Sequence, residues 1–216
     1  MNIDFALILV ILTLITGLGA LFDKFILKDR SKVSSQLVAK ILENCRSLFP
    51  IFLLVLLIRS FVVEPYRIPT GSLKPSLLDG DFILVNKYDY GLRLPITNSL
   101  IMSYKKPQRG DIMVFRWPVD PTRYNFIKRV IGLPGDHISY INKTLYINGI
   151  KANLSYIKNS TDYSGNNQSW PVQVYQENLL GVKHQIYQIA SQPPYDILDI
   201  IVPPHMYFMM GDNRDD

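Results

Sequence analysis

The chain has 216 residues, a formal net charge of +5, one cysteine and three histidines. A single cysteine excludes an intramolecular disulfide, and Cys45 and the scattered His137, His184 and His205 lack the spacing of a zinc site, so we expect no metal and no cofactor. Much of the positive charge lies between two apolar stretches near the N-terminus, which favours membrane lipids over nucleic acid as its partner.

The first apolar stretch predicts a transmembrane helix within residues 1–22. Residues 5–22 (FALILVILTLITGLGALF) carry no charge and are long enough, as a helix, to cross a hydrocarbon layer of about 30 Å. A cleaved signal peptide is the alternative. It is disfavoured because Asn2 and Asp4, rather than basic residues, precede the run.

A basic loop, residues 23–46, and a second apolar stretch, residues 47–63, follow. The loop contains Lys24, Lys28, Arg30, Lys32, Lys40 and Arg46 against Asp23, Asp29 and Glu43. Short basic loops stay in the cytoplasm, so the chain after Val63 should lie on the opposite side of the membrane. The second stretch has Pro50 near its start and Arg59 near its end, where a long side chain can reach the interface. Its alternative is a buried core helix.

From Glu64 onward, short apolar runs alternate with Pro, Gly, Asn and Asp, which predicts an antiparallel β-domain. The expected strands are residues 81–88, 111–116, 126–132 and 137–141, followed by a hairpin arm, 145–149, that ends in Asn-Gly. We expect a β-domain in residues 64–136, an inserted β-ribbon or loop region in 137–205, and a return strand in 206–216. Residues 151–192 form the polar part of the insertion.

Ser72 is a candidate nucleophile close to the membrane. It lies nine residues after Val63, which an extended chain spans in about 30 Å. Pro69 and Pro75 oppose a helix on either side, and Gly71 permits an unusual backbone, so a stiff turn could present the hydroxyl. A lone serine is more often a turn residue. No Gly-x-Ser-x-Gly is present, and Ser-x-x-Lys fails because Lys74 follows Ser72 by two positions.

Lys128 is the candidate base that would activate Ser72. In residues 126–131 (FIKRVI), alternation places Lys128 on the face of Phe126 and Val130, which a small β-domain would turn inward. Burial lowers the pKa of a lysine and so yields a neutral amine able to accept a proton. The alternative is that Lys128 and Arg129 lie on a solvated strand edge.

Four segments in order resemble the sequence boxes of bacterial type I signal peptidases. They are residues 59–78 (RSFVVEPYRIPTGSLKPSLL), 109–115 (RGDIMVF), 127–136 (IKRVIGLPGD) and 211–215 (GDNRD). The likeness runs from the second apolar stretch to the last residue, apart from the polar insertion. It implies a serine endopeptidase with Ser72 as nucleophile and Lys128 as general base, anchored in the bacterial inner membrane with its β-domain on the periplasmic side. Its substrates would be preproteins that carry signal peptides.

The resemblance also assigns roles to other residues. Thr70 stands where the family often has serine, and its hydroxyl would form the oxyanion hole with the Ser72 N–H; Leu73 stands where methionine is usual. Five apolar residues would line the pockets for the residues one and three before the cut, which explains an Ala-x-Ala preference: Ile68, Leu77, Ile83, Val114 and Ile127. Pro69, Leu73 and Phe126 are further expected substrate contacts. Gly71, Arg129, Asp212, Arg214 and Asp215 are expected to be structural.

One departure concerns the C-terminal box. In the family a serine and an Asp-Ser-Arg stretch follow Gly-Asp-Asn-Arg-Asp, whereas the sequence here stops at Asp216. We therefore expect it to be part of a longer protein. Two alternatives to an active peptidase stay open. One is an inactive relative that binds preproteins or organises a secretion complex, and the other is a membrane anchor that carries an unrelated β-domain.

Overall fold

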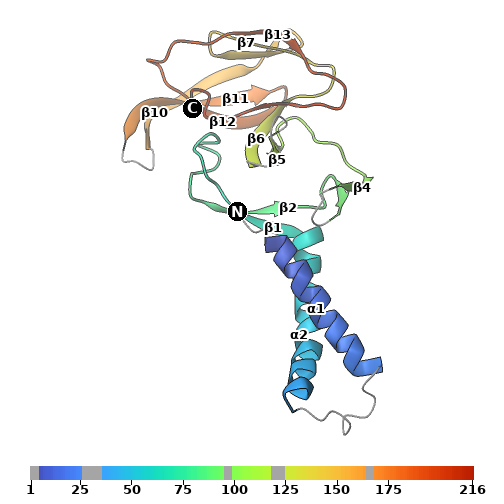
Figure 1. Cartoon of the computed structure of the whole chain (residues 1–216). Helices are drawn as coiled ribbons and strands as arrows, with labels where there is room; N and C mark the ends of the chain where they lie inside the picture. Colours follow the sequence, from blue (N-terminus) through green and yellow to red (C-terminus); the bar gives the residue numbers. More distant parts are fainter. Residues whose placement is uncertain (1–4, 26–35, 95–98, 118–124, 164–167) are drawn as a thin grey trace. The chain divides into compact units, whose positions relative to one another are not determined.

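A computed structural model describes residues 5–25, 36–94, 99–117, 125–163 and 168–216 (Figure 1). The chain divides into two compact units. The first comprises Met1–Pro65 and Leu84–Lys106, and the second comprises Tyr66–Ile83 and Pro107–Asp216. Of the predicted basic loop, residues 26–35 lie outside the described residues, and so do residues 164–167 of the predicted insertion.

The first unit contains two helices, α1 (Phe5–Phe25) and α2 (Gln36–Phe61), which run antiparallel to each other (Figure 1). Their most apolar windows have mean hydropathies of 2.6 and 1.9, so both are long and apolar enough to cross a membrane. The helices approach closely at two glycines. A Cβ at Gly17 would lie 2.9 Å from the ring of Phe49, and one at Gly19 would lie 2.8 Å from Cys45. Small residues at such contacts let helix backbones approach each other.

The second helix differs from the expected span, 47–63. It begins at Gln36, because residues 36–46 are rich in Leu, Ala, Lys and Glu, which favour helix although they are too polar to be read as a membrane span. It ends at Phe61, and Val63 already belongs to strand β1 (Val63–Arg67). Pro50 lies inside the helix.

The other short strands pair locally. Strand β1 pairs with β2 (Phe82–Asn86), and β3 (Gly91–Arg93) pairs antiparallel with β4 (Leu100–Ser103). Of these strands, only β2 corresponds to a predicted one.

Three antiparallel sheets make up most of the second unit. The first has the order β14-β6-β5, built from β5 (Ile112–Arg116), β6 (Asn125–Gly132) and β14 (Phe208–Met210). The second has the order β13-β7-β8-β9, built from β7 (His137–Ile141), β8 (Thr144–Ile147), β9 (Ile150–Lys151) and β13 (Ile197–Ile201). The third has the order β10-β11-β12, built from β10 (Asn153–Tyr163), β11 (Ser169–Leu179) and β12 (Val182–Gln188).

The strands predicted near residues 111–116, 126–132 and 137–141 are confirmed as β5, β6 and β7. The Asn-Gly turn is confirmed as well. Asn148 and Gly149 have φ of 52° and 77°, the left-handed pair that a two-residue hairpin turn requires, and they join β8 to β9.

The hydrophobic core of this unit includes residues of 137–205, the segment predicted as an inserted β-ribbon or loop region. Its buried residues are Ile131, Ile138, Tyr140, Leu145, Ile147, Ala152, Leu179, Val202 and Met210. Most of them lie within 137–205. The physical reason is the alternation on β7 and β8, where Ile138 opposes Ile147 and Tyr140 opposes Leu145, so one face of the hairpin is wholly apolar. This region is therefore part of the folded body of the second unit.

Candidate active site

Ser72 lies in a tight turn between β1 and β2. The turn is closed at its base by two main-chain hydrogen bonds: the Ile68 N–H donates to the Asp81 carbonyl, and the Gly80 N–H donates to the Ile68 carbonyl, both at 2.9 Å. Leu73 anchors the turn because its side chain is fully buried. Ser72 itself is 6% exposed. A predicted turn residue thus occupies a rigid, largely covered position.

Gly211 lies close both to the turn that carries Ser72 and to Lys128 of strand β6. The N–H of Asn213 donates to the Ser72 carbonyl at 3.1 Å, which fixes the segment after β14 against the turn. A Cβ at Gly211 would overlap the Ser72 carbonyl oxygen and lie 3.3 Å from Lys128 Nζ. Only a glycine permits this approach. The Ser72 carbonyl and Lys128 Nζ, which are 56 positions apart in the sequence, therefore both lie beside Gly211.

Lys128 is half-buried on β6, opposite Met113 of β5. Burial lowers the pKa of Lys128 from its ordinary value of 10.5, and the charges of Asp216 and Asp212 oppose this shift without cancelling it. On the face predicted to point inward, Phe126 and Lys128 are half-buried and Val130 is fully buried, while Ile127 and Arg129 on the other face are buried too. Arg129 can be covered because Asp212 neutralises it. The partial burial of Lys128 therefore shifts its protonation equilibrium towards the neutral amine.

Thr70 is close to the nucleophile. Its Oγ1 lies 3.4 Å from Ser72 Oγ, while the residue as a whole is exposed. Two hydroxyl groups are therefore adjacent on one turn. A hydroxyl at this position could donate a hydrogen bond to an oxygen that gains negative charge beside Ser72.

Lys74 is a second lysine near Ser72, and its surroundings shift its pKa in the opposite direction to that of Lys128. Burial by itself lowers the pKa of Lys74, but hydrogen bonds to Asp79 and Asp162 outweigh it and raise the pKa. Lys74 therefore stays an ammonium ion. Of the two lysines, Lys128 is the one whose pKa is shifted in the direction that a proton acceptor requires.

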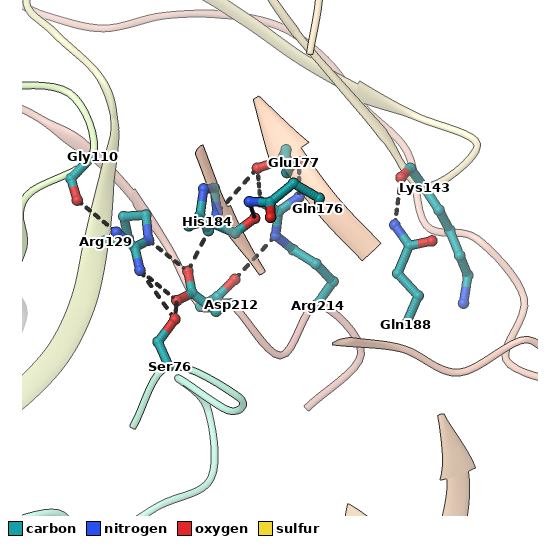
Figure 2. Close-up of polar contacts among 11 residues, drawn as sticks. Ser76, Gly110, Arg129, Lys143, Gln176, Glu177, His184, Gln188, Asp212 and Arg214 are labelled. Carbon is teal, nitrogen blue, oxygen red and sulfur yellow. Dashed lines mark hydrogen bonds and ion pairs between the residues drawn. The ribbon is translucent and has the colours of Figure 1, made fainter. Parts of the chain in front are cut away.

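Arg129 and Asp212 form a buried ion pair beside Gly211 (Figure 2). Arg129 donates from Nε to Asp212 Oδ1 at 2.8 Å and from Nη2 to Oδ2 at 2.7 Å, and it donates from Nη1 to the Gly110 carbonyl at 2.7 Å. The hydroxyl of Ser76 also donates to Asp212. This two-pronged geometry is among the stronger protein hydrogen-bond arrangements, and it fixes the residue that follows Gly211.

A second buried pair links the C-terminal segment to the β10-β11-β12 sheet (Figure 2). Arg214 donates from Nη1 to Glu177 Oε1 at 2.8 Å, and its Nη2 pairs with Oε2. His184 Nε2 lies 3.3 Å from Glu177 Oε2 and 3.6 Å from Asp212 Oδ1. Burial would raise the pKa of Glu177, but Arg214 and His184 lower it to about 2. Glu177 is thus charged at neutral pH.

Sequence reasoning missed Glu177, His184 and Asp162. Glu177 and His184 face each other across β11 and β12, and only the pairing register of those strands reveals it. A buried glutamate in a strand of mixed polar and apolar residues carries no local signal, because exposed and buried acidic residues look the same in a sequence.

The other predicted site residues fall into three groups. Ile68 and Ile127 are buried; Leu77, Ile83, Val114 and Phe126 are half-buried; Pro69 is exposed. Val114 and Ile127 are cross-strand neighbours on β5 and β6. Leu73 was expected to contact substrate, but it is fully buried and presents no surface for this. Its role in the structure is to anchor the turn.

The remaining structural predictions concern Gly71, Arg129, Asp212, Arg214 and Asp215. A Cβ at Gly71 would lie 3.1 Å from Lys74 Cε. Asp215 Oδ2 accepts a hydrogen bond from Lys143 Nζ at 2.8 Å and one from the Ile189 N–H at 2.7 Å. Arg129, Asp212 and Arg214 are at most 7% exposed. Within the ranges that the structure describes, no group of three or more His, Cys, Asp or Glu side chains could hold a metal ion.

Comparison with known proteins shows the family to which this chain is similar. A family model described as signal peptidase, peptidase S26, matches residues 41–216. The signal peptidase I of Pseudomonas fluorescens is 41% identical over 237 residues, which cover 100% of this chain and 81% of the relative. That of Pseudomonas aeruginosa is 40% identical over 240 residues, with the same coverage, and that of Haemophilus influenzae is 28% identical over 274 residues, covering 98% and 78%. The chain therefore belongs to the signal peptidase family, peptidase S26.

Proposed function

We propose that this chain is a membrane-anchored serine endopeptidase that removes N-terminal signal peptides from exported preproteins. Membership of the family supports the reaction. The observation that supports the assignment of residues is that the Ser72 carbonyl and Lys128 Nζ both lie beside Gly211, together with the lowered pKa of Lys128. Nucleophilic catalysis by a serine requires a nearby group that can accept its proton.

The reaction follows from these groups. Ser72 Oγ attacks the carbonyl carbon of the bond to be cut, and its proton passes to the neutral amine of Lys128. The carbonyl oxygen becomes an oxyanion, which the Thr70 hydroxyl and the Ser72 N–H stabilise. The C–N bond then breaks, the Lys128 ammonium gives its proton to the leaving amine, and an ester forms on Ser72. Water hydrolyses the ester, with Lys128 again accepting a proton and Ser72 regaining one.

Substrate would bind in extended form beside the apolar residues of this region. Ile68, Leu77, Ile83, Val114, Phe126 and Ile127 belong to the turn, to β2, and to β5 and β6. Main-chain hydrogen bonds of an added strand would fix its register, and small pockets would then select small side chains. Pro69, which is exposed beside Thr70, would contact the same segment. This arrangement accounts for an Ala-x-Ala preference.

The two helices supply the anchor. The basic residues between them favour a cytoplasmic connection, which supports a position of the β-domain on the periplasmic face of the inner membrane. Signal peptides are themselves held in the membrane as they emerge. An anchored peptidase therefore meets its substrate at the surface where cleavage is required.

The test uses the full chain, purified in detergent, and a preprotein with an Ala-x-Ala site. Cleavage at that site by the wild-type chain, and its loss in Ser72→Ala and in Lys128→Met, are the expected results. A serine-directed peptide inhibitor should label the wild-type chain and fail to label Ser72→Ala. Undiminished cleavage by either variant would refute the assigned dyad. A wild-type chain that binds preprotein without cutting it would instead favour an inactive binding protein.

A further inference from the structure

Lys74 forms a buried cluster of charges that the proposed reaction does not use. Lys74 and Asp162 are each 6% exposed. Lys74 Nζ lies 2.9 Å from Asp162 Oδ1 and 2.7 Å from Asp79 Oδ1, and it donates to the Tyr163 carbonyl at 2.7 Å. An ammonium ion has three donors, so all of them are used. A lysine held in this way is a fixed link between chain segments.

The cluster is linked to the main chain around Ser72 by two routes. On one side, the Lys74 N–H donates to the Gly71 carbonyl at 3.0 Å, and the Lys74 side chain lies against Gly71. On the other side, Asp162 Oδ2 accepts a hydrogen bond from Asn213 Nδ2 at 3.3 Å, and the Asn213 N–H donates to the Ser72 carbonyl at 3.1 Å. Asp162 is thus linked through Lys74 to Gly71 and through Asn213 to the Ser72 carbonyl.

Asp162 comes from a different part of the fold. It lies near the end of β10, opposite Trp170 of β11, in the region predicted as an insertion. Reaching a lysine 88 positions away in the sequence requires the whole β10-β11-β12 sheet to lie beside the turn. A buried ion pair adds little net stability compared with apolar side chains of the same size. The geometry that it fixes is the more informative property.

We propose that Asp162 is a positioning residue of the active site, which holds the turn that carries Ser72 in line with Gly211 and Lys128 through Lys74 on one side and Asn213 on the other. This inference rests on the proposed role of Ser72. It gives the β10-β11-β12 sheet a task in the reaction, namely to hold in place the turn that carries the nucleophile. Asp162 touches no reacting atom.

The kinetic test compares Asp162→Asn, Lys74→Met and the double variant in the full chain, purified in detergent, with rates expressed per folded protein. Each single variant should lower kcat about tenfold or more, because small displacements of a reacting group are costly. KM for the preprotein should stay within about twofold, since the link does not face the substrate pockets. The kcat of the double variant should be no lower than that of the more impaired single variant, because both changes break one chain of contacts.

Two matched controls each remove one charge outside the Lys74 cluster. Lys158→Met changes an exposed lysine on the same strand as Asp162, and Asp199→Asn changes a carboxylate whose side chain is 67% exposed. Both should keep the wild-type kcat. Single-variant losses that multiply in the double variant, or a wild-type kcat in Asp162→Asn, would overturn the proposal.

A measurement that needs no activity separates this inference from the proposed function. The Asn213 amide, which bonds to the Ser72 carbonyl, should exchange with deuterium about tenfold faster in Asp162→Asn than in the wild type and the two controls. This result in a chain that cuts no preprotein would support the bracing and refute the peptidase assignment. Unchanged exchange would refute the bracing. If Asp162→Asn does not fold, Asn213→Ala replaces it, since it removes only the side-chain link, and an unchanged kcat there would also refute the bracing.

Discussion

At the scale of single residues, the surroundings of two lysines near one serine shift their pKa values in opposite directions. Lys128 has its pKa lowered by burial, whereas the carboxylates around Lys74 raise the pKa of that residue. The same type of side chain is therefore shifted towards its neutral form in one place and held as a cation in the other. The difference lies in the presence of acceptors that neutralise the buried charge.

The lowered pKa of Lys128 predicts the pH dependence of cleavage. Lys128 must be neutral to accept the Ser72 proton, so kcat/KM should be high above its pKa and fall as the pH drops through it. Because burial lowers that pKa, the midpoint of the acidic limb should lie below the ordinary lysine value of 10.5. A pH profile of preprotein cleavage measures this. Lys128→Arg should be inactive at every pH, since a guanidinium stays charged; a midpoint at or above the ordinary value would contradict the role of Lys128.

Thr70 provides a second test at this scale. Its hydroxyl lies 3.4 Å from Ser72 Oγ, and removing one oxyanion donor costs about 2.7–4 kcal/mol of transition-state stabilisation. Thr70→Val, which keeps the shape and deletes the hydroxyl, should slow kcat about a hundredfold or more. Thr70→Ser is the matched control, and it should lower kcat only slightly because it keeps the hydroxyl. Equal rates for the two variants would remove Thr70 from the oxyanion hole.

At the scale of elements, short segments that are distant in sequence converge on the active site. The turn supplies Ser72, β6 supplies Lys128 and Arg129, and the segment after β14 supplies Gly211 and Asp212. The β10-β11-β12 sheet adds Glu177, His184 and Asp162 as buried partners of that segment. The Ser72 carbonyl and Arg129 are therefore each held by a residue of the segment that follows β14.

The pair formed by Glu177 and Arg214 should contribute to stability in a pH-dependent way. The pKa of Glu177 is lowered from 4.5 to about 2 in the folded chain. Its contribution, about 3 kcal/mol from that difference, is therefore present above pH 4.5 and is lost as the pH falls towards 2. Glu177→Gln should lower the free energy of unfolding by about this much at pH 7 and by less at pH 3.

Denaturant unfolding of the detergent-solubilised chain, followed by tryptophan fluorescence at the two pH values, measures this difference. Asp199→Asn is the control, because a change at an exposed carboxylate should cost no more than about 0.5 kcal/mol. A loss in Glu177→Gln that is the same at both pH values would show that the Glu177 charge is not the source of the stability.

At the scale of the whole molecule, the proposed topology can be tested by labelling. In a Cys45→Ser background, Lys151→Cys places a thiol at an exposed position on β9, and Lys32→Cys places one between the helices. In right-side-out membrane vesicles, a membrane-impermeant maleimide should label Lys151→Cys at once and Lys32→Cys only after detergent is added. The reverse pattern would invert the orientation and move the β-domain to the cytoplasm.

The sequence by itself determined the features that depend on neighbouring residues. Continuous apolar composition predicted both helices, alternation predicted β5, β6 and β7, and Asn-Gly predicted the turn between β8 and β9. The ordered motifs also identified the family. Each of these signals is contained in a window of a few residues to a few tens of residues, so no knowledge of pairing is needed.

Only the tertiary structure decided which distant residues meet. It placed most of the core inside the region read as an insertion, buried Leu73, and brought Glu177 and Asp162 to the segment that follows Gly211. Such contacts depend on strand order and register. A polar strand with buried charges looks like an exposed one until its partners are known, because the ionic contacts that permit burial come from other parts of the chain.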